Sequence, residues 1–116
     1  MGLLTRQGPP TWHPAPEALR AACVAAAALC KARGGDLSEL AIQHAVRNDG
    51  IATTLVGMCT RAQVQANVRC ATAAFESMSG DISALLDEVH AILAPVKNTT
   101  WPSGRPENTV APAALV

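Results

Sequence analysis

The stretch IATTLVGMCTRAQVQANVRC, residues 51–70, carries the two local signals on which the expected fold depends. It begins with a β-branched run, residues 51–56, which ends at Gly57 and is typical of a β-strand. Thr60 and Gln63 then have the spacing of a capping box, so a helix is expected to begin at Arg61. A strand that leads through a glycine turn into a helix presents free backbone N–H groups to a phosphate. The stretch therefore predicts one strand, one helix and a candidate anion-binding turn between them.

Helical patterns occupy most of the remaining chain. They predict helices over residues 17–33, 36–48, 61–76 and 81–94. Pro16 suits the first turn of the first helix, and Gly34 and Gly35 are expected to end it. Asp36 is placed to cap the second helix, which ends in a turn that leads directly into the predicted strand.

Apolar residues at helical spacing show which helix faces are expected to be buried. Cys23 and Cys30 lie seven residues apart and are interpreted as small core residues, because the four cysteines form no CxxC pair that would indicate a metal site. His44 lies on an apolar face and is interpreted as a packing residue. In the third helix, the residues predicted to face inwards are Val64, Val68, Ala71 and Phe75.

The order of these elements is loop, helix, helix, strand, helix, helix and tail. A single strand cannot form a sheet, so this order indicates the last part of a longer fold built from βα repeats. Residues 1–16 form an irregular, proline-rich loop, and residues 105–116 are expected to be an irregular tail.

Composition excludes several classes of partner. The formal net charge is +0 and aromatic residues make up 3% of the chain, which argues against nucleic-acid binding. No apolar run has the length of a membrane span, so no membrane partner is expected. The N-terminal residues lack the apolar core of a signal peptide, so a cytoplasmic location is expected.

Four motifs of the chain are distinctive: GPPTWHPAP (residues 8–16), LAIQHAVRN (40–48), TLVGM (54–58) followed by Gln63 and Asn67, and PVKNTTWPSG (95–104). Together they resemble the C-terminal part of the aldo-keto reductase family, and most of all its plant and algal L-galactose dehydrogenase branch. The resemblance covers residues 1–104 and implies an α/β fold, the C-terminal fragment of a (β/α)8 TIM barrel. In that fold, residues 51–56 would be the eighth strand and the helix from Arg61 the eighth barrel helix.

The resemblance also implies a cofactor site. Gly57, Met58, Cys59 and Thr60 would form the turn that meets the phosphate and ribose of a nicotinamide dinucleotide. Gln63 and Asn67, four residues apart on one helix face, would reach its adenine. Arg61 is the only basic residue near this turn, which favours NAD, with NADP as the alternative.

Trp12 and His13 would line the sugar pocket, since residues 1–16 correspond to a substrate-side loop of the family. The implied reaction is oxidation of an aldose at C1 to a lactone. The family's catalytic Asp, Tyr, Lys and His lie on earlier strands, and this chain has no tyrosine. The resemblance therefore implies no catalytic residue here and no activity for the chain alone.

Other interpretations of the same residues remain open. The turn at residues 57–60 is also compatible with an ordinary strand-to-helix connection, Trp12 with packing against helices, and His13 with a solvated loop position. The alternative function is a small helical interaction module that pairs its lone strand with a partner chain.

Overall fold

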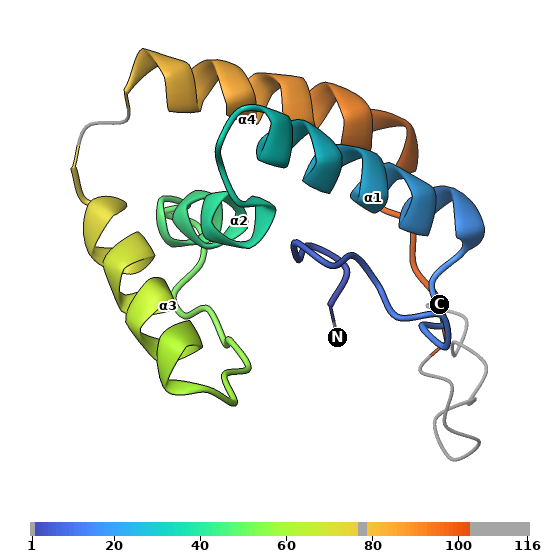
Figure 1. Cartoon of the computed structure of the whole chain (residues 1–116), viewed down its shortest axis with the longest axis horizontal. Coiled ribbons are helices and arrows are strands. Elements are labelled where there is room, and N and C mark those ends of the chain that lie inside the picture. The colour runs from blue at the N-terminus through green and yellow to red at the C-terminus, as the bar shows by residue number, and fades with distance from the viewer. Residues whose placement is uncertain (1, 77–78, 103–116) are drawn as a thin grey trace, which may run out of the picture.

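The structure, a computed structural model, describes residues 2–76 and 79–102, and this part of the chain is helical (Figure 1). All four predicted helices are confirmed. Their bounds are α1 Glu17–Ala32, α2 Leu37–Val46, α3 Arg61–Ala73 and α4 Gly80–Leu93, and a 3-10 helix, η1 Ala94–Val96, follows α4 directly. The tail predicted at residues 105–116 lies outside the described residues.

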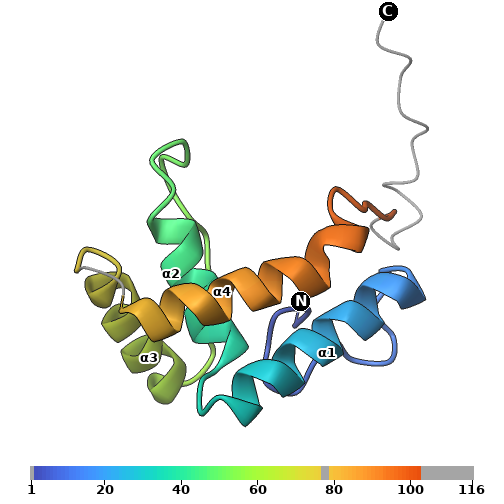
Figure 2. The same cartoon turned by 90° about the horizontal axis from the view of Figure 1, so that it is seen from above.

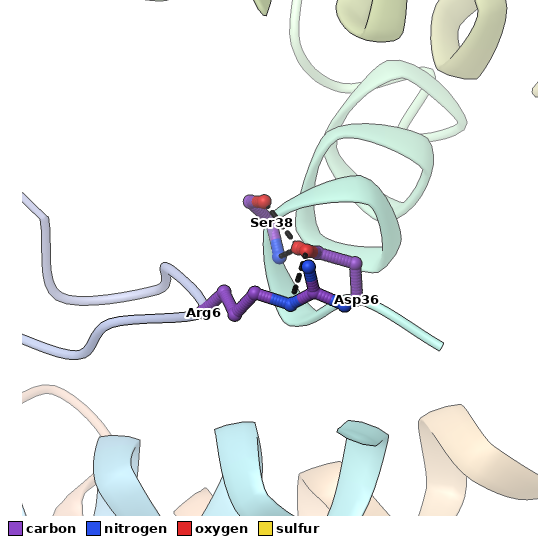
Figure 3. A network of polar contacts seen from close by, with 3 residues as sticks. All are labelled: Arg6, Asp36 and Ser38. Carbon is purple, nitrogen blue, oxygen red and sulfur yellow. Dashed lines mark hydrogen bonds and ion pairs between the residues drawn. The ribbon is translucent and has the colours of Figure 1, made fainter. Parts of the chain in front are cut away.

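The boundary between α1 and α2 forms as the local sequence dictates. Gly34 has φ +73, and the N–H groups of Gly34 and Gly35 donate to the carbonyls of Lys31 and Cys30, which is a Schellman end to α1. Asp36 then accepts a hydrogen bond from the Ser38 amide (2.8 Å) and caps α2. Figure 3 shows that Arg6, from the N-terminal loop, reaches the same carboxylate at 3.7 Å.

The helices pack in two pairs, α1 along α4 and α2 on α3, and α1 also contacts α2 (Figure 2). The Arg33–Glu88 ion pair links α1 and α4 at the surface. The interpretation of Cys23 and Cys30 as core residues is confirmed, because both are almost fully buried. The central cluster consists of Ala26, Cys30, Leu37, Leu40 and Val89.

The predicted strand at residues 51–56 is wrong, and so is the α/β barrel fragment that depended on it. No strand forms within residues 2–76 and 79–102, and residues 51–60 are all exposed. A β-branched run becomes a strand only when a neighbouring strand pairs with its backbone. The described part of the chain offers helices and loops but no second strand. The alternative function, pairing of this segment with a strand of another chain, stays a prediction.

The predicted inward face of α3 is also wrong for three of its four residues, whereas the fourth, Ala71, is half-buried. Val64, Val68 and Phe75 are 44%, 60% and 85% exposed. The helix instead contacts α2 through a different side, where Cys70 is buried. Amphipathic spacing marks a face that needs cover, and here no described residue provides it.

Arg47, at the end of α2, fastens α2 to α3. Its Nη2 donates hydrogen bonds to the carbonyls of Ala73 (3.1 Å), the last residue of α3, and Glu76 (3.0 Å), three residues further on. The Ala73 carbonyl also accepts the Glu76 N–H at 3.1 Å, so the guanidinium adds a second donor there and complements the negative end of the helix. In the described part of the chain, the helices are all too short or too polar to cross a lipid bilayer.

Candidate functional site

The capping box predicted at the start of α3 is confirmed. The Thr60 side chain accepts a hydrogen bond from the Gln63 amide at 3.2 Å. In return, Oε1 of Gln63 accepts hydrogen bonds from the backbone N–H groups of Thr60 (3.1 Å) and Cys59 (2.8 Å). The cap therefore uses three backbone donors, and only part of the helix N-terminus remains open to an anion.

The donors that remain are the N–H groups of Arg61 and Ala62, at the first two positions of α3. They point out of the positive end of the helix dipole, where a phosphate oxygen is stabilised. A Cβ placed on Gly57 would meet no atom within 4 Å, so its backbone is open to a close approach. This end of α3 retains the elements of an anion site, although a smaller one than the sequence suggests.

The predicted cofactor site consists of six residues, which lie close together in the loop before α3 and in its first two turns. Gly57, Met58, Cys59 and Thr60 are exposed, as is Gln63, and Asn67 is half-buried one turn further along α3. The amide oxygen of Gln63 is engaged in the cap, so only its NH2 group is left to meet a ligand. Asn67 has no such commitment in the described hydrogen bonds.

Trp12 and His13, predicted to line a sugar pocket, occupy opposite environments. Trp12 is 69% exposed, whereas His13 is only 4% exposed. The alternative interpretation of His13 as a solvated loop residue is therefore wrong, and Trp12 leaves most of its surface open to solvent. A turn closed by the His13 N–H and the Pro10 carbonyl (3.0 Å) directs the two neighbouring side chains differently.

The tautomer of the neutral His13 ring follows from its hydrogen bonds. Nδ1 accepts from the Ala15 N–H at 3.1 Å, so in the neutral ring the proton lies on Nε2. Nε2 is buried and has no hydrogen-bond partner among the described residues. The ring lies between Trp12, stacked at 6.2 Å, and Trp101, which meets it edge-on at 5.5 Å. The three rings form an aromatic cluster with one unused donor.

The structure does not bring the two predicted halves of the site together. The loop that carries Trp12 and His13 precedes α1 at one end of the molecule, and α3 lies at the other end in both views (Figures 1 and 2). The longest dimension of the molecule is 44 Å. A substrate at the aromatic cluster and a cofactor at α3 would therefore need further structure to bring them into contact.

A mostly apolar cavity of about 680 Å³ lies between α1, α4 and the N-terminal loop. His44 and His90 meet at its wall with ring centroids 4.9 Å apart, and both are exposed rather than packed in the core. The prediction of a packing role for His44 was therefore wrong. Trp101 also lines this cavity, together with Leu3, Leu4, Leu19, Cys23 and Leu93. No local signal in the sequence could have joined these residues, because they come from segments far apart in the chain.

The four cysteines belong to no cluster of metal-ligand side chains among the described residues. Within residues 2–76 and 79–102, no three His, Cys, Asp or Glu residues cluster around a common point. Burial raises the pKa of the Cys23 and Cys30 thiols, and it does the same for Cys70. Cys59 is exposed and donates to Oε1 of Gln63 at 3.3 Å.

The chain is similar in sequence to a curated plant protein. L-galactose dehydrogenase from Arabidopsis thaliana is 50% identical over 108 residues, which cover 93% of this chain. No family profile matches the chain. The matched region is 33% of the plant protein, so the chain spans about a third of the length of this curated relative. The chain is therefore similar, over nearly its whole length, to one portion of a plant sugar dehydrogenase.

Proposed function

We propose that this chain is part of a cytoplasmic oxidoreductase of the aldo-keto reductase family that oxidises an aldose at C1 to a lactone. The observation that carries the proposal is the 50% identity to L-galactose dehydrogenase across 93% of the chain. At such identity the side chains of a shared site can be compared position by position. The sugar is the substrate, and a nicotinamide dinucleotide, when bound, would supply the hydride acceptor.

The N-terminus of α3 is the part of the chain that we assign to the cofactor. The free N–H groups of Arg61 and Ala62 and the positive helix end suit a phosphate oxygen, and the open backbone at Gly57 permits its approach. Asn67 can offer both a donor and an acceptor to the adenine edge. Because residues 57–59 carry no positive charge, the proposed cofactor is NAD, with NADP as the alternative.

The aromatic cluster of Trp12, His13 and Trp101 is assigned to the sugar. An exposed indole face such as that of Trp12 suits the apolar C–H face of a pyranose, and the Nε2–H of His13 is a donor for a hydroxyl oxygen. The exposure of Trp12 and the unused donor of His13 support this assignment.

The chain does not contain every group that the reaction needs. Oxidation of a sugar at C1 requires a base to remove a proton from the hydroxyl group as hydride leaves. The family uses a tyrosine for this proton, and the chain has no tyrosine. We therefore assign no catalytic residue to this chain, and we expect it to be inactive without the polypeptide that carries the tyrosine.

A chimera tests the proposal. The matched portion of the Arabidopsis protein is replaced by this chain, and the Kd for NAD is measured by calorimetry. Asn67→Ala should raise the Kd about fivefold, which corresponds to about 1 kcal/mol for one lost neutral hydrogen bond. Arg69→Ala, an exposed change on the same helix, is the matched control.

The outcomes separate the assignments. An unchanged Kd in the Asn67 variant would remove this residue from the site. A folded chimera that binds neither NAD nor NADP would contradict the proposed function as a whole.

A further inference from the structure

Two of the three histidines of the chain come from different helices and meet in space. His44, on α2, and His90, on α4, have ring centroids 4.9 Å apart and an interplanar angle of 76°. Leu40, one turn before His44, and Val89, the neighbour of His90, belong to the same core cluster. The packed core therefore fixes the two backbone positions from which the imidazole rings extend.

The nitrogen atoms of these two rings are not engaged in the structure. Both side chains are exposed, so neither ring is packed in the core. In residues 2–76 and 79–102, the one histidine ring that takes part in a hydrogen bond is that of His13. Neutral imidazole is the commonest metal ligand in proteins, and here two imidazoles without hydrogen-bond partners lie beside each other.

The separation of the rings matches that of two histidines on one metal ion. An ion about 2.1 Å from one nitrogen of each ring, with an angle of about 90–110° between the two bonds, places the ring centroids about 4.6–5.3 Å apart. The observed 4.9 Å lies within this interval. Because both rings are exposed and torsion about χ2 is soft, each ring can turn one nitrogen toward a shared point without any movement of the helices.

We propose that His44 and His90 form a binding site for a late first-row divalent metal ion, of which Ni²⁺ and Zn²⁺ are examples. Imidazole nitrogen is a ligand of borderline softness that suits these ions, whereas Mg²⁺ and Ca²⁺ prefer oxygen. An ion bound to both rings would join α2 to α4, and therefore the pair α2 and α3 to the pair α1 and α4. The site uses no residue of the proposed cofactor or sugar sites, so it does not depend on the proposed function.

The two histidines are the only protein ligands that we assign to this ion. Within the described residues, no third histidine, cysteine or acidic side chain joins them in a cluster. Cys23 lines the same cavity, but its thiol is buried and burial raises its pKa, so it stays protonated and does not ligate the ion. Water completes the coordination, and we expect weaker binding than at a structural zinc site with four protein ligands.

The third histidine provides an internal control for a test by nuclear magnetic resonance. Ni²⁺ is paramagnetic and broadens the signals of nearby protons. Added to the full chain in less than equimolar amount, it should broaden the ring signals of His44 and His90 together and leave those of the buried His13 sharp. Cys59→Ser is the background of every measurement, because the exposed Cys59 thiol also attracts soft metal ions.

Two substitutions decide whether the rings act as a pair. His44→Gln removes one of the two ligands and should raise the Kd for Ni²⁺, measured from the broadening of His90, at least about tenfold. Asp87→Asn is the matched control, because this exposed carboxylate lies one turn before His90 on the same helix, and it should leave the Kd unchanged. Equal Ni²⁺ binding at His90 with and without His44, or an equal loss in the Asp87 variant, would overturn the proposal.

Thermal unfolding gives a second readout. Ni²⁺ at about ten times its Kd should raise Tm by about 5 °C or more, because the ion binds the folded chain in preference to the unfolded one. Mg²⁺ at the same concentration should leave Tm unchanged. His44→Gln and His90→Gln should each lose the response to Ni²⁺, and their Tm without metal shows that they remain folded. A rise of the same size with and without the two histidines would overturn the proposal.

Discussion

The pair of helices α1 and α4 and the pair α2 and α3 differ in what covers their apolar side chains. Where α1, α4 and the inner side of α2 meet, Cys30 and Val89 are at most 3% exposed. On the outer side of α3 and in the loop before it, Leu55 and Val68 face solvent at 94% and 60%. Both α1 and α3 carry apolar residues at helical spacing, so this spacing alone does not decide burial. The difference teaches that amphipathic spacing marks a face that requires cover but does not show which residues provide it.

The comparison predicts a large loss of stability in the core and almost none in the loop before α3. Leu40→Ala removes a side chain that is 6% exposed and should lower the free energy of unfolding by about 3 kcal/mol. Leu55→Ala removes the same atoms from a side chain that is 94% exposed and should change the free energy of unfolding by less than about 0.5 kcal/mol. Urea denaturation followed by circular dichroism measures both. Similar losses would mean that Leu55 is buried in solution.

A loss of stability of intermediate size is expected at Arg47, which joins α2 to α3. Arg47→Ala removes the hydrogen bonds to the Ala73 and Glu76 carbonyls and should cost about 1.5 kcal/mol, because a charged donor is lost from a half-buried position. Arg69→Ala, an exposed change on α3 itself, serves as control. Hydrogen exchange should show that the Arg47 variant loses protection in α3 before α1. Uniform loss of protection over all helices would show instead that the two regions unfold as one unit.

The smallest predicted loss of stability concerns Asp36, the cap of α2, and it depends on pH. Burial alone raises the pKa of the Asp36 carboxyl group, but hydrogen bonds from Ser38 and Glu39 and the charge of Arg6 outweigh it. The pKa is therefore held below its ordinary value of 3.8. A lowered pKa in the folded state stabilises the protein above the unfolded-state pKa, and this stabilisation disappears as the pH falls through the folded-state pKa.

The matching variants are Asp36→Ala and Asp36→Asn. The alanine variant should lose about 1 kcal/mol at pH 7, because the cap of α2 is lost. The asparagine variant should keep most of the cap and should lose the part of the acid dependence of stability below about pH 4 that Asp36 contributes. Urea midpoints measured from pH 2 to pH 7 test this, and an unchanged acid dependence in Asp36→Asn would contradict it.

Local features of this fold were predictable from the sequence, and non-local ones were not. Pro16, Gly34, Asp36 and the Thr60–Gln63 capping box set the helix ends through contacts within four residues, and the helices form where these signals place them. The prediction of a strand at residues 51–56 was wrong because strand formation depends on a partner strand that is distant in sequence. The prediction of the buried face of α3 was wrong for a related reason, since no described residue covers that face.

In the candidate site, too, local features were predictable from the sequence and contacts between distant segments were not. The capping box at Thr60 was predictable, but the use of the Gln63 oxygen in that cap, which removes it from ligand binding, needed the geometry. The opposite exposures of Trp12 and His13 follow from a turn and from contact with Trp101, almost ninety positions further along the chain. No local pattern could have predicted that contact.

The unequal burial of the four cysteines has a practical consequence. Cys23, Cys30 and Cys70 are buried, and their raised pKa values keep these thiols protonated and unreactive near neutral pH. Cys59 is exposed beside the first turn of α3. A maleimide added to the folded chain should therefore react at Cys59 alone, without any engineered substitution. Because Cys59 belongs to the proposed cofactor turn, a bound nucleotide should slow this reaction, so the rate of labelling reports occupancy of the turn.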